Sequence, residues 1–259
     1  MSPADGRGAV ARLNPVTKFA AALLIALPLV VTVDAVSAGV ALLLELPLLL
    51  SAGLAWRTFW LRTLPLWIGA PATALTIALY GEQSGKVYVE WLFVRVSEGS
   101  LALALAAFLR VLAIGLPTVV LFVTVDPTDL ADGLAQIVRL PARFVLGALA
   151  GMRMLGLLAD DWRALSLARR ARGVADSGRA RRALGTAFAL FVLAIRRGSA
   201  LATAMEARAF GAPMRRTWAR ESRLGGGDVL LMLVGLAISV IALAVSIAVG
   251  AFNPIFGPR

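Results

Sequence analysis

The sequence predicts an all-α polytopic membrane protein with about five transmembrane helices and a cytoplasmic helical domain between the fourth and the fifth. Three observations support this fold class. Of the 259 residues, 59% are hydrophobic, and much of the positive charge lies in one segment. Five apolar runs also approach the roughly 20 helical residues that a hydrocarbon core of about 30 Å requires. The runs cover residues 16–33, 35–55, 63–80, 101–125 and 229–250.

Only Asp34 separates the first two runs. One straight helix over both would be about 60 Å long at ~1.5 Å per residue, far more than a bilayer core, so a tight helical hairpin is predicted. The first 15 residues are largely polar, and the run after them lacks a small-residue cleavage site. The first run is therefore expected to remain as a membrane span.

The positive charge is concentrated between the fourth and fifth runs. Residues 126–227 hold 17 of the 26 basic residues, all of them arginine, and eight acids. The predicted organisation is an N-terminal part with four spans (1–125), this arginine-rich segment (126–227), and a final span with a short tail (228–259). The glycines at 225–227 predict a flexible joint, with Asp228 as the cap of the last span.

Start and stop signals divide the arginine-rich segment into helices. Asp126 is an N-cap candidate and Pro127 suits the first helical position. Gly173 and Gly211, with Gly178 and Pro213, are stop signals. The predicted helices cover residues 127–140, 141–172 and 179–210.

The basic residues also predict the orientation. Bases near the first span and between the second and third are Arg7, Arg12, Lys18, Arg57 and Arg62. With five spans, these lie on the same side as the arginine-rich segment, and positive loops face the cytoplasm. The N-terminus is then cytoplasmic and the C-terminus outside. A further span at 144–159 would export most of the arginines, so that run is expected to be a helix with one apolar face.

The composition excludes several function classes. The chain has no cysteine and no histidine, so thiol nucleophiles, histidine bases and the usual zinc ligands are absent. We predict no catalytic residue, no metal and no cofactor. Nucleic acid is not an expected partner despite the basic composition, because aromatic residues are too sparse in 126–227 to form a stacking platform.

Two charged residues lie deep within the predicted spans. Glu45 and Arg110 are each about 14–15 Å from the outer side at ~1.5 Å per residue. A lone arginine there costs on the order of 3 kcal/mol, which a facing carboxylate would largely offset. An intramembrane ion pair between them is predicted, and the alternative is that Arg110 faces another polar group or water.

A short triplet recurs near the end of each long helix. It reads Ala171-Arg172-Gly173 in the first and Ala207-Arg208-Ala209 in the second. An arginine flanked by small residues can present its planar guanidinium to a carboxylate on a partner. The alternative is that these arginines, like their neighbours, only set topology or bind anionic lipid.

The order of these pieces resembles the transmembrane T component of energy-coupling factor (ECF) transporters, ABC transporters with relatives in vitamin and cobalt or nickel uptake. The similarity covers nearly the whole chain, although Ala209 stands where glycine is common and Val16 where arginine is frequent. The matching pieces are LNPVTK (13–18), EGSLALALAAFLR (98–110), TVDPTDLADGL (124–134), LP (140–141), ARRARG (168–173) and AMEARAFG (204–211).

The resemblance implies a coupling role. Residues 171–173 and 207–209 would contact two cytoplasmic ATPase subunits, and a small substrate-binding membrane protein would pack on the apolar faces of the long helices. ATP hydrolysis would belong to the partners, so the chain itself is not expected to be an enzyme. The alternative is a secondary transporter with its own substrate site, although no internal repeat is visible. The substrate is not encoded in this chain.

Overall fold

The computed structural model describes residues 8–81, 84–91, 94–173, 178–212 and 217–254. Arg7 and Pro213, used above, lie outside the described residues. The described chain contains eight α-helices, a short 3₁₀ helix at Ala9–Arg12 and one two-stranded hairpin. It divides into two compact units. The bundle unit comprises Met1–Leu130 and Ser222–Arg259, and the arginine-rich unit comprises Ala131–Glu221.

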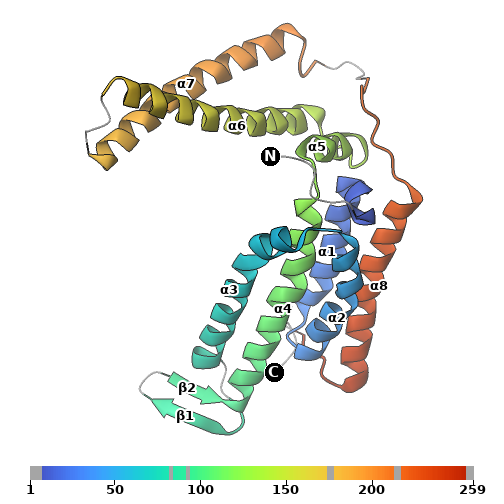
Figure 1. The fold of residues 1–259 in the computed structure, drawn as a ribbon. Coiled ribbons are helices and arrows are strands. Elements are labelled where there is room, and N and C mark those ends of the chain that lie inside the picture. Colours follow the sequence, from blue (N-terminus) through green and yellow to red (C-terminus); the bar gives the residue numbers. More distant parts are fainter. Residues whose placement is uncertain (1–7, 82–83, 92–93, 174–177, 213–216, 255–259) are drawn as a thin grey trace. The chain divides into compact units, whose positions relative to one another are not determined.

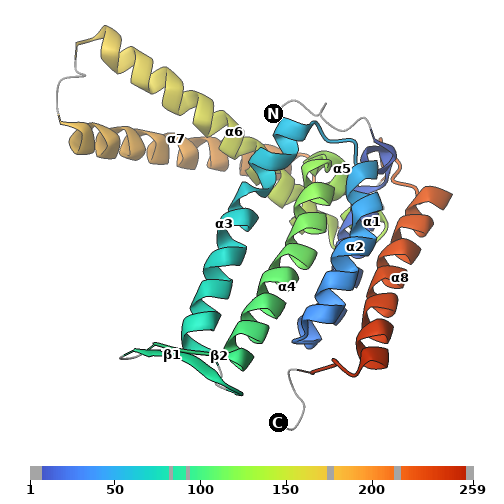
Figure 2. The ribbon, with the colours of Figure 1, turned by 60° about the horizontal axis from the view of Figure 1, so that its bottom comes forward.

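Five apolar helices form the bundle unit. They are α1 (Pro15–Val31), α2 (Ala35–Ser51), α3 (Trp56–Tyr80), α4 (Glu98–Val123) and α8 (Gly226–Val249). Helices α1 and α2 each pack against α4 and α8, and α3 packs on α4 (Figures 1 and 2). A turn at residues 32–34 separates α1 from α2 as predicted, and the Asp34 side chain caps α2 by accepting from the Ser37 amide at 3.1 Å. The two helices pack mainly on α4 and α8 and hardly on each other, so the hairpin is less tight than predicted.

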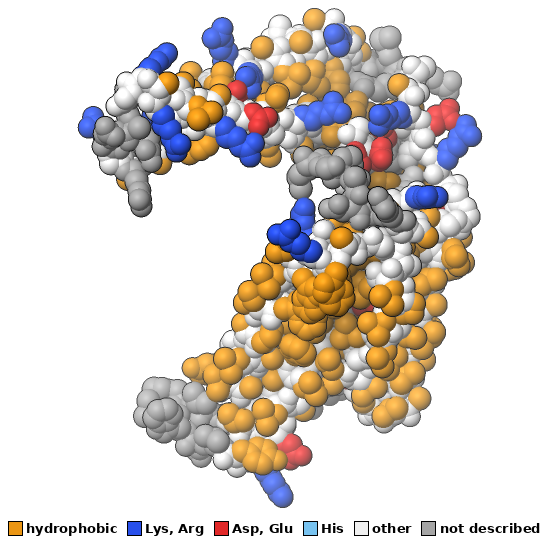
Figure 3. Space-filling view, viewed as in Figure 1, with side chains coloured by type: hydrophobic (Ala, Val, Ile, Leu, Met, Phe, Trp, Pro, Cys, Tyr) orange, Lys and Arg blue, Asp and Glu red, His pale blue; other side chains and the backbone are white. Residues whose placement is uncertain are grey.

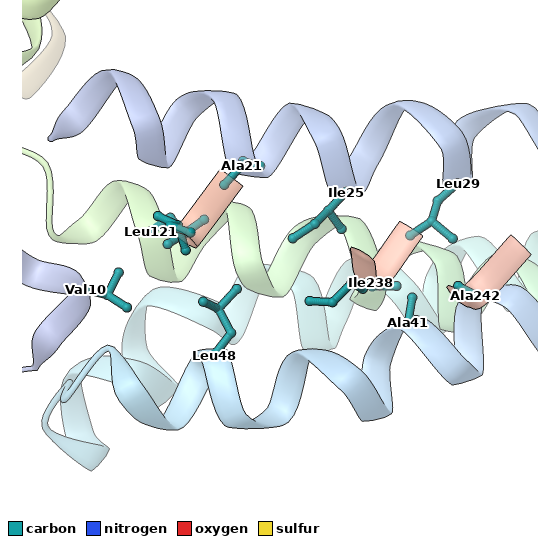
Figure 4. Packing of buried hydrophobic residues seen from close by; sticks show 12 residues of the cluster. Val10, Ala21, Ile25, Leu29, Ala41, Leu48, Leu121, Ile238 and Ala242 are labelled. Carbon is teal, nitrogen blue, oxygen red and sulfur yellow. The ribbon is translucent and has the colours of Figure 1, made fainter. Parts of the chain in front are cut away.

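Small side chains let these helices approach closely. Ala21 and Ala41 are fully buried beside Ile25 and Leu29 in the main core cluster (Figure 4). A methyl group added at Gly235 of α8 would lie 3.1 Å from the carbonyl oxygen of Ala21. Close helix contact through small residues is a usual basis of packing within membranes, where lipid is as apolar as leucine.

Long apolar helices confirm the predicted class of a polytopic, nearly all-α membrane protein. Within the described residues, five helices are long and apolar enough to cross a membrane, namely α3, α4, α8, α6 (Ala142–Ala171) and most of α7 (Arg179–Ala207). This set differs from the five predicted runs. Helices α1 and α2 have 17 residues each, the lower end of the range that spans a bilayer.

Several predicted boundaries were wrong. Helix α3 begins at Trp56 rather than near residue 63, so Arg57 and Arg62 lie on its first turns. Between α3 and α4, where no strand was predicted, lie the strands β1 (Val87–Trp91) and β2 (Val94–Ser97), paired antiparallel.

The predicted glycine joint before the last span is also wrong. Gly226 and Gly227 belong to α8, and Gly225 is its N-cap. Asp228 is the third residue of the helix rather than its cap. Its carboxylate reaches back and accepts from the Gly225 amide at 2.8 Å, which is one half of a capping-box arrangement.

The arginine-rich unit has little interior. Helix α5 (Pro127–Gln136), whose first residues still belong to the bundle unit, begins as predicted, with Asp126 accepting from the Thr128 amide at 2.7 Å, and ends four residues before the predicted Leu140. Helices α6 and α7 follow as a pair. Among their described side chains, only Val145 and Thr186 are buried. On the face seen in Figure 3, arginine side chains spread over these helices, whereas apolar side chains cover most of the bundle unit.

Candidate partner-binding site

The two Ala-Arg-small triplets occupy the same structural position at the ends of α6 and α7. Ala171 and Ala207 are the last helical residues, and Arg172 and Arg208 are the C-caps. The third residue of each triplet, Gly173 or Ala209, has a left-handed backbone, with φ values of 69° and 55°. The triplet therefore corresponds to one local structure: the helix ends at the alanine, the arginine is the C-cap, and the next residue has a left-handed backbone.

Hydrogen bonds define this turn at the end of α7. The Phe210 amide donates to the Met205 carbonyl at 2.9 Å, and the Ala209 amide donates to the Glu206 carbonyl at 2.9 Å. This pair of bonds is the Schellman motif, whose left-handed position favours glycine. At the end of α6 the Gly173 amide donates to the Arg170 carbonyl at 3.1 Å, the equivalent of the second bond. Ala209 therefore carries a steric cost that Gly173 avoids.

Both capping arginines are exposed. The side chains of Arg172 and Arg208 have no hydrogen-bond or ion-pair partner among the described residues. All three residues of each triplet are solvent-accessible, and the small neighbours leave the guanidinium uncrowded. Each arginine can therefore offer its planar group to a carboxylate on another molecule.

The two arginines lie far apart within the arginine-rich unit. Arg169, three residues before Arg172, donates to the Gly185 carbonyl at 2.9 Å, which places the end of α6 beside the start of α7. Arg208 lies at the other end of α7, a helix of 29 residues, about 43 Å long at ~1.5 Å per residue. The two arginines are thus suited to two separate contacts rather than to one pocket.

Neighbouring arginines differ from the two caps. Arg169 is engaged with α7, and Arg197 forms an ion pair with Asp161 at 2.5 Å that joins α7 to α6. Arg170 and Arg181 are exposed. The side chain of Arg182 lies outside the described residues. Arg169 and Arg197 thus join α6 to α7, whereas the exposed arginines remain accessible to solvent.

The ion pair predicted between Glu45 and Arg110 is not formed. Glu45 is fully buried, and neither of its carboxylate oxygens has a hydrogen-bond partner among the described residues. Arg110 on α4 is half-buried, and one nitrogen of its guanidinium group also has no hydrogen-bond partner among the described residues. Equal depth in two spans was an insufficient argument, because depth does not fix the direction in which a helical side chain points.

Sequence reasoning missed two buried polar clusters in the bundle unit. At the end of the bundle where α2 begins, the Asp34 carboxylate accepts from the hydroxyls of Ser37 and Ser246, which ties α2 to α8. At the opposite end, the ammonium group of Lys18 is buried and donates to residues of two other segments. A charged residue at the edge of an apolar run was the available signal, because buried charges require partners.

Fold and site together define a class: a polytopic helical membrane protein with a pair of exposed, arginine-capped helices. Comparison with known proteins identifies the family within this class. The family model for CbiQ, a cobalt transport protein, matches residues 7–218. The chain therefore belongs to this family.

Individual relatives agree with the family match. An energy-coupling factor transporter transmembrane protein, EcfT, of Exiguobacterium sibiricum is 30% identical over 181 residues, covering 64% of this chain and 69% of the relative. EcfT of Acidaminococcus fermentans is 28% identical over 257 residues, covering 91% and 92%. EcfT of Limosilactobacillus fermentum is 27% identical, covering 71% and 73%. The chain is thus a transmembrane T component of the energy-coupling factor type.

Proposed function

We propose that this chain is the coupling subunit of an ECF-type importer for a micronutrient, a vitamin or a metal ion. Two cytoplasmic ATPase subunits each bind one arginine-capped helix end, and a small substrate-binding membrane protein packs against the apolar surface of α6 and α7. ATP-driven closure of the ATPases moves these helices and so moves the substrate-binding protein. The chain itself carries no catalytic step.

One observation carries this proposal, the equivalence of the two helix ends. Two copies of one local structure, each with an exposed arginine at the C-cap, suit two similar acidic grooves. A lipid-binding role requires only positive charge and gives no reason for the repeated Ala-Arg-small turn. The separation of the arginines by about the length of α7 matches two subunits rather than one.

The orientation belongs to the same proposal. The N-terminus and the arginine-rich unit face the cytoplasm, where ATP is available, and the C-terminus faces outward across the plasma membrane. The distribution of arginine and lysine supports this orientation. The apolar surface of α6 and α7, which includes Phe188 and Phe191 at 70% and 63% exposure, then remains for a membrane partner or lipid.

Pull-down of the ATPase subunits tests the proposal. Arg172→Ala or Arg208→Ala weakens association by about 2–5 kcal/mol at one contact, since the partner carboxylate is left unpaired. The double variant loses both contacts. Arg170→Ala and Arg181→Ala are the controls, as exposed neighbours on the same helices, and leave association nearly unchanged. Equal, graded losses at all four positions would show that charge alone matters and would contradict the coupling assignment.

A further inference from the structure

The buried ammonium group of Lys18 holds the end of α4. The side chain is 1% exposed. Its nitrogen donates to the Ala11 carbonyl at 3.1 Å, to the Thr124 carbonyl at 3.2 Å and to the Thr124 hydroxyl at 2.9 Å. A lysine has three donors, and here each has an acceptor. Thr124 is the C-cap of α4, the last residue before the chain leaves for α5.

Asn14, four residues before Lys18, contacts the segment in which the chain re-enters the bundle unit. Its side-chain amide donates to the Ser222 hydroxyl at 2.8 Å and to the Arg223 carbonyl at 3.3 Å. Its backbone amide donates to the Asp228 carboxylate at 2.7 Å. Ser222 is the first residue of the bundle unit after the arginine-rich unit, and Asp228 lies in the first turn of α8.

Charge and packing join these two contacts into one cluster. The negative charges that act on Lys18 are those of Asp129 and Asp228, which lie before and after the arginine-rich unit in the chain. Leu13 packs tightly against the start of α8, where a methyl group added at Gly227 would lie 2.9 Å from its Cδ2 atom. One short segment, residues 11–18, therefore contacts both the outgoing and the returning chain.

We propose that Asn14 and Lys18 are positioning residues that clamp both connections of the arginine-rich unit to the membrane bundle, so that movement of this unit is passed to the bundle instead of being absorbed by loose connections. This inference rests on the proposed coupling function. Two flexible connections would let α6 and α7 move without any effect on α1, α4 and α8. The clamp fixes the two connections at one place.

The polar cluster of Asp34, Ser37 and Ser246 provides a matched comparison. Ser246 of α8 is fully buried and donates to Asp34, so it contributes a hydrogen bond between helices of the same bundle. It lies at the other end of α8 and touches neither connection. Removing its hydroxyl weakens the bundle, while removing the Thr124 hydroxyl weakens the bundle and also loosens the clamp.

The first test uses the chain alone in lipid nanodiscs. The chain has no cysteine, so spin labels attach only at Pro127→Cys and Leu224→Cys, one on each connection. Lys18→Met removes all three donors, and Thr124→Val is a milder variant in case the first does not fold. We expect one narrow distance peak for the parent chain and for Ser246→Ala, and loss of that peak for Lys18→Met and Thr124→Val. A peak that stays narrow in both clamp variants, at a thermal stability equal to that of Ser246→Ala, would overturn the proposal.

The second test uses the complex with the ATPase subunits. Labels at Val192 of α7 and Leu236 of α8 report whether MgATP changes the distance between the units. We expect an ATP-dependent shift in the parent complex and in Ser246→Ala, and loss of the shift in Lys18→Met while ATP hydrolysis continues. A full shift in Lys18→Met contradicts the clamp. No shift in the parent complex contradicts the proposed coupling function instead, and the first test then still decides the clamp.

Discussion

The bundle unit and the arginine-rich unit are both built from long apolar helices, but they use their apolar surfaces differently. Seven residues of α1 are buried within the chain, whereas α6 and α7 together bury only Val145 and Thr186 among their described side chains. Apolar composition alone therefore does not tell whether a helix packs inside its own chain. The bundle unit buries apolar side chains in its own core, whereas the arginine-rich unit leaves most of its apolar side chains exposed.

The largest expected difference between the units concerns their apolar side chains. Ile25→Ala opens a cavity at a fully buried position and should lower the free energy of unfolding by about 2–5 kcal/mol. Phe188→Ala, at a position that is 70% exposed, should stay within about 0.5 kcal/mol. Thermal unfolding of the purified chain in detergent measures both. Similar losses would mean that α7 packs within its own chain.

Next in size are two buried acids of the bundle unit. Asp34→Asn disturbs hydrogen bonds from Ser37 and Ser246 and should cost about 1–3 kcal/mol of stability. Glu45→Gln removes a carboxyl group that has no hydrogen-bond partner among the described residues, so we expect a change within about 0.5 kcal/mol. The same unfolding assay compares them. A larger loss of unfolding free energy for Glu45→Gln would argue that Glu45 does pair with Arg110, as the sequence predicted.

Within the arginine-rich unit, the two helix ends should respond oppositely to exchange of their third residues. Ala209→Gly relieves a left-handed alanine and Gly173→Ala creates one, so each should shift the stability of the last helical turn by about 1 kcal/mol, upward at Ala209 and downward at Gly173. Amide hydrogen exchange of the last turns of α6 and α7 measures the change. Shifts of the same sign at both ends would contradict the shared motif.

The smallest expected effect concerns the ion pair between α6 and α7. Arg197→Met removes a partly exposed contact with Asp161 and should cost about 0.5 kcal/mol, since solvent screens such pairs. Hydrogen exchange near Asp161 should rise slightly. Arg163→Met is the matched control, because the exposed pair of Arg163 with Asp160 lies within α6 and does not connect it to α7. An equal response at both positions would show that the pair does not join the helices.

Local patterns in the sequence predicted most of the helices and the repeated triplets. Hydrophobic runs, Asp126 before Pro127, and glycine after arginine act over a few residues, so they can be read without knowing the fold. The start of α3 and the strand hairpin were missed, because a helix whose first turn carries Arg57 and aromatic residues, and two short strands, give weak local signals.

The sequence by itself determined the class of protein and the recurrence of an Ala-Arg-small triplet near the ends of two long helices, because each depends on residues that are neighbours along the chain. The structure added that both arginines are C-caps, since α7 ends at Ala207 and not at the predicted residue 210. Only the tertiary structure decided which charges meet. It separated Glu45 from Arg110 and joined Asp34 to Ser246 and Lys18 to Thr124. The physical reason is that a buried polar group must find its partner across helices, and the rotation and packing of those helices depend on the whole core.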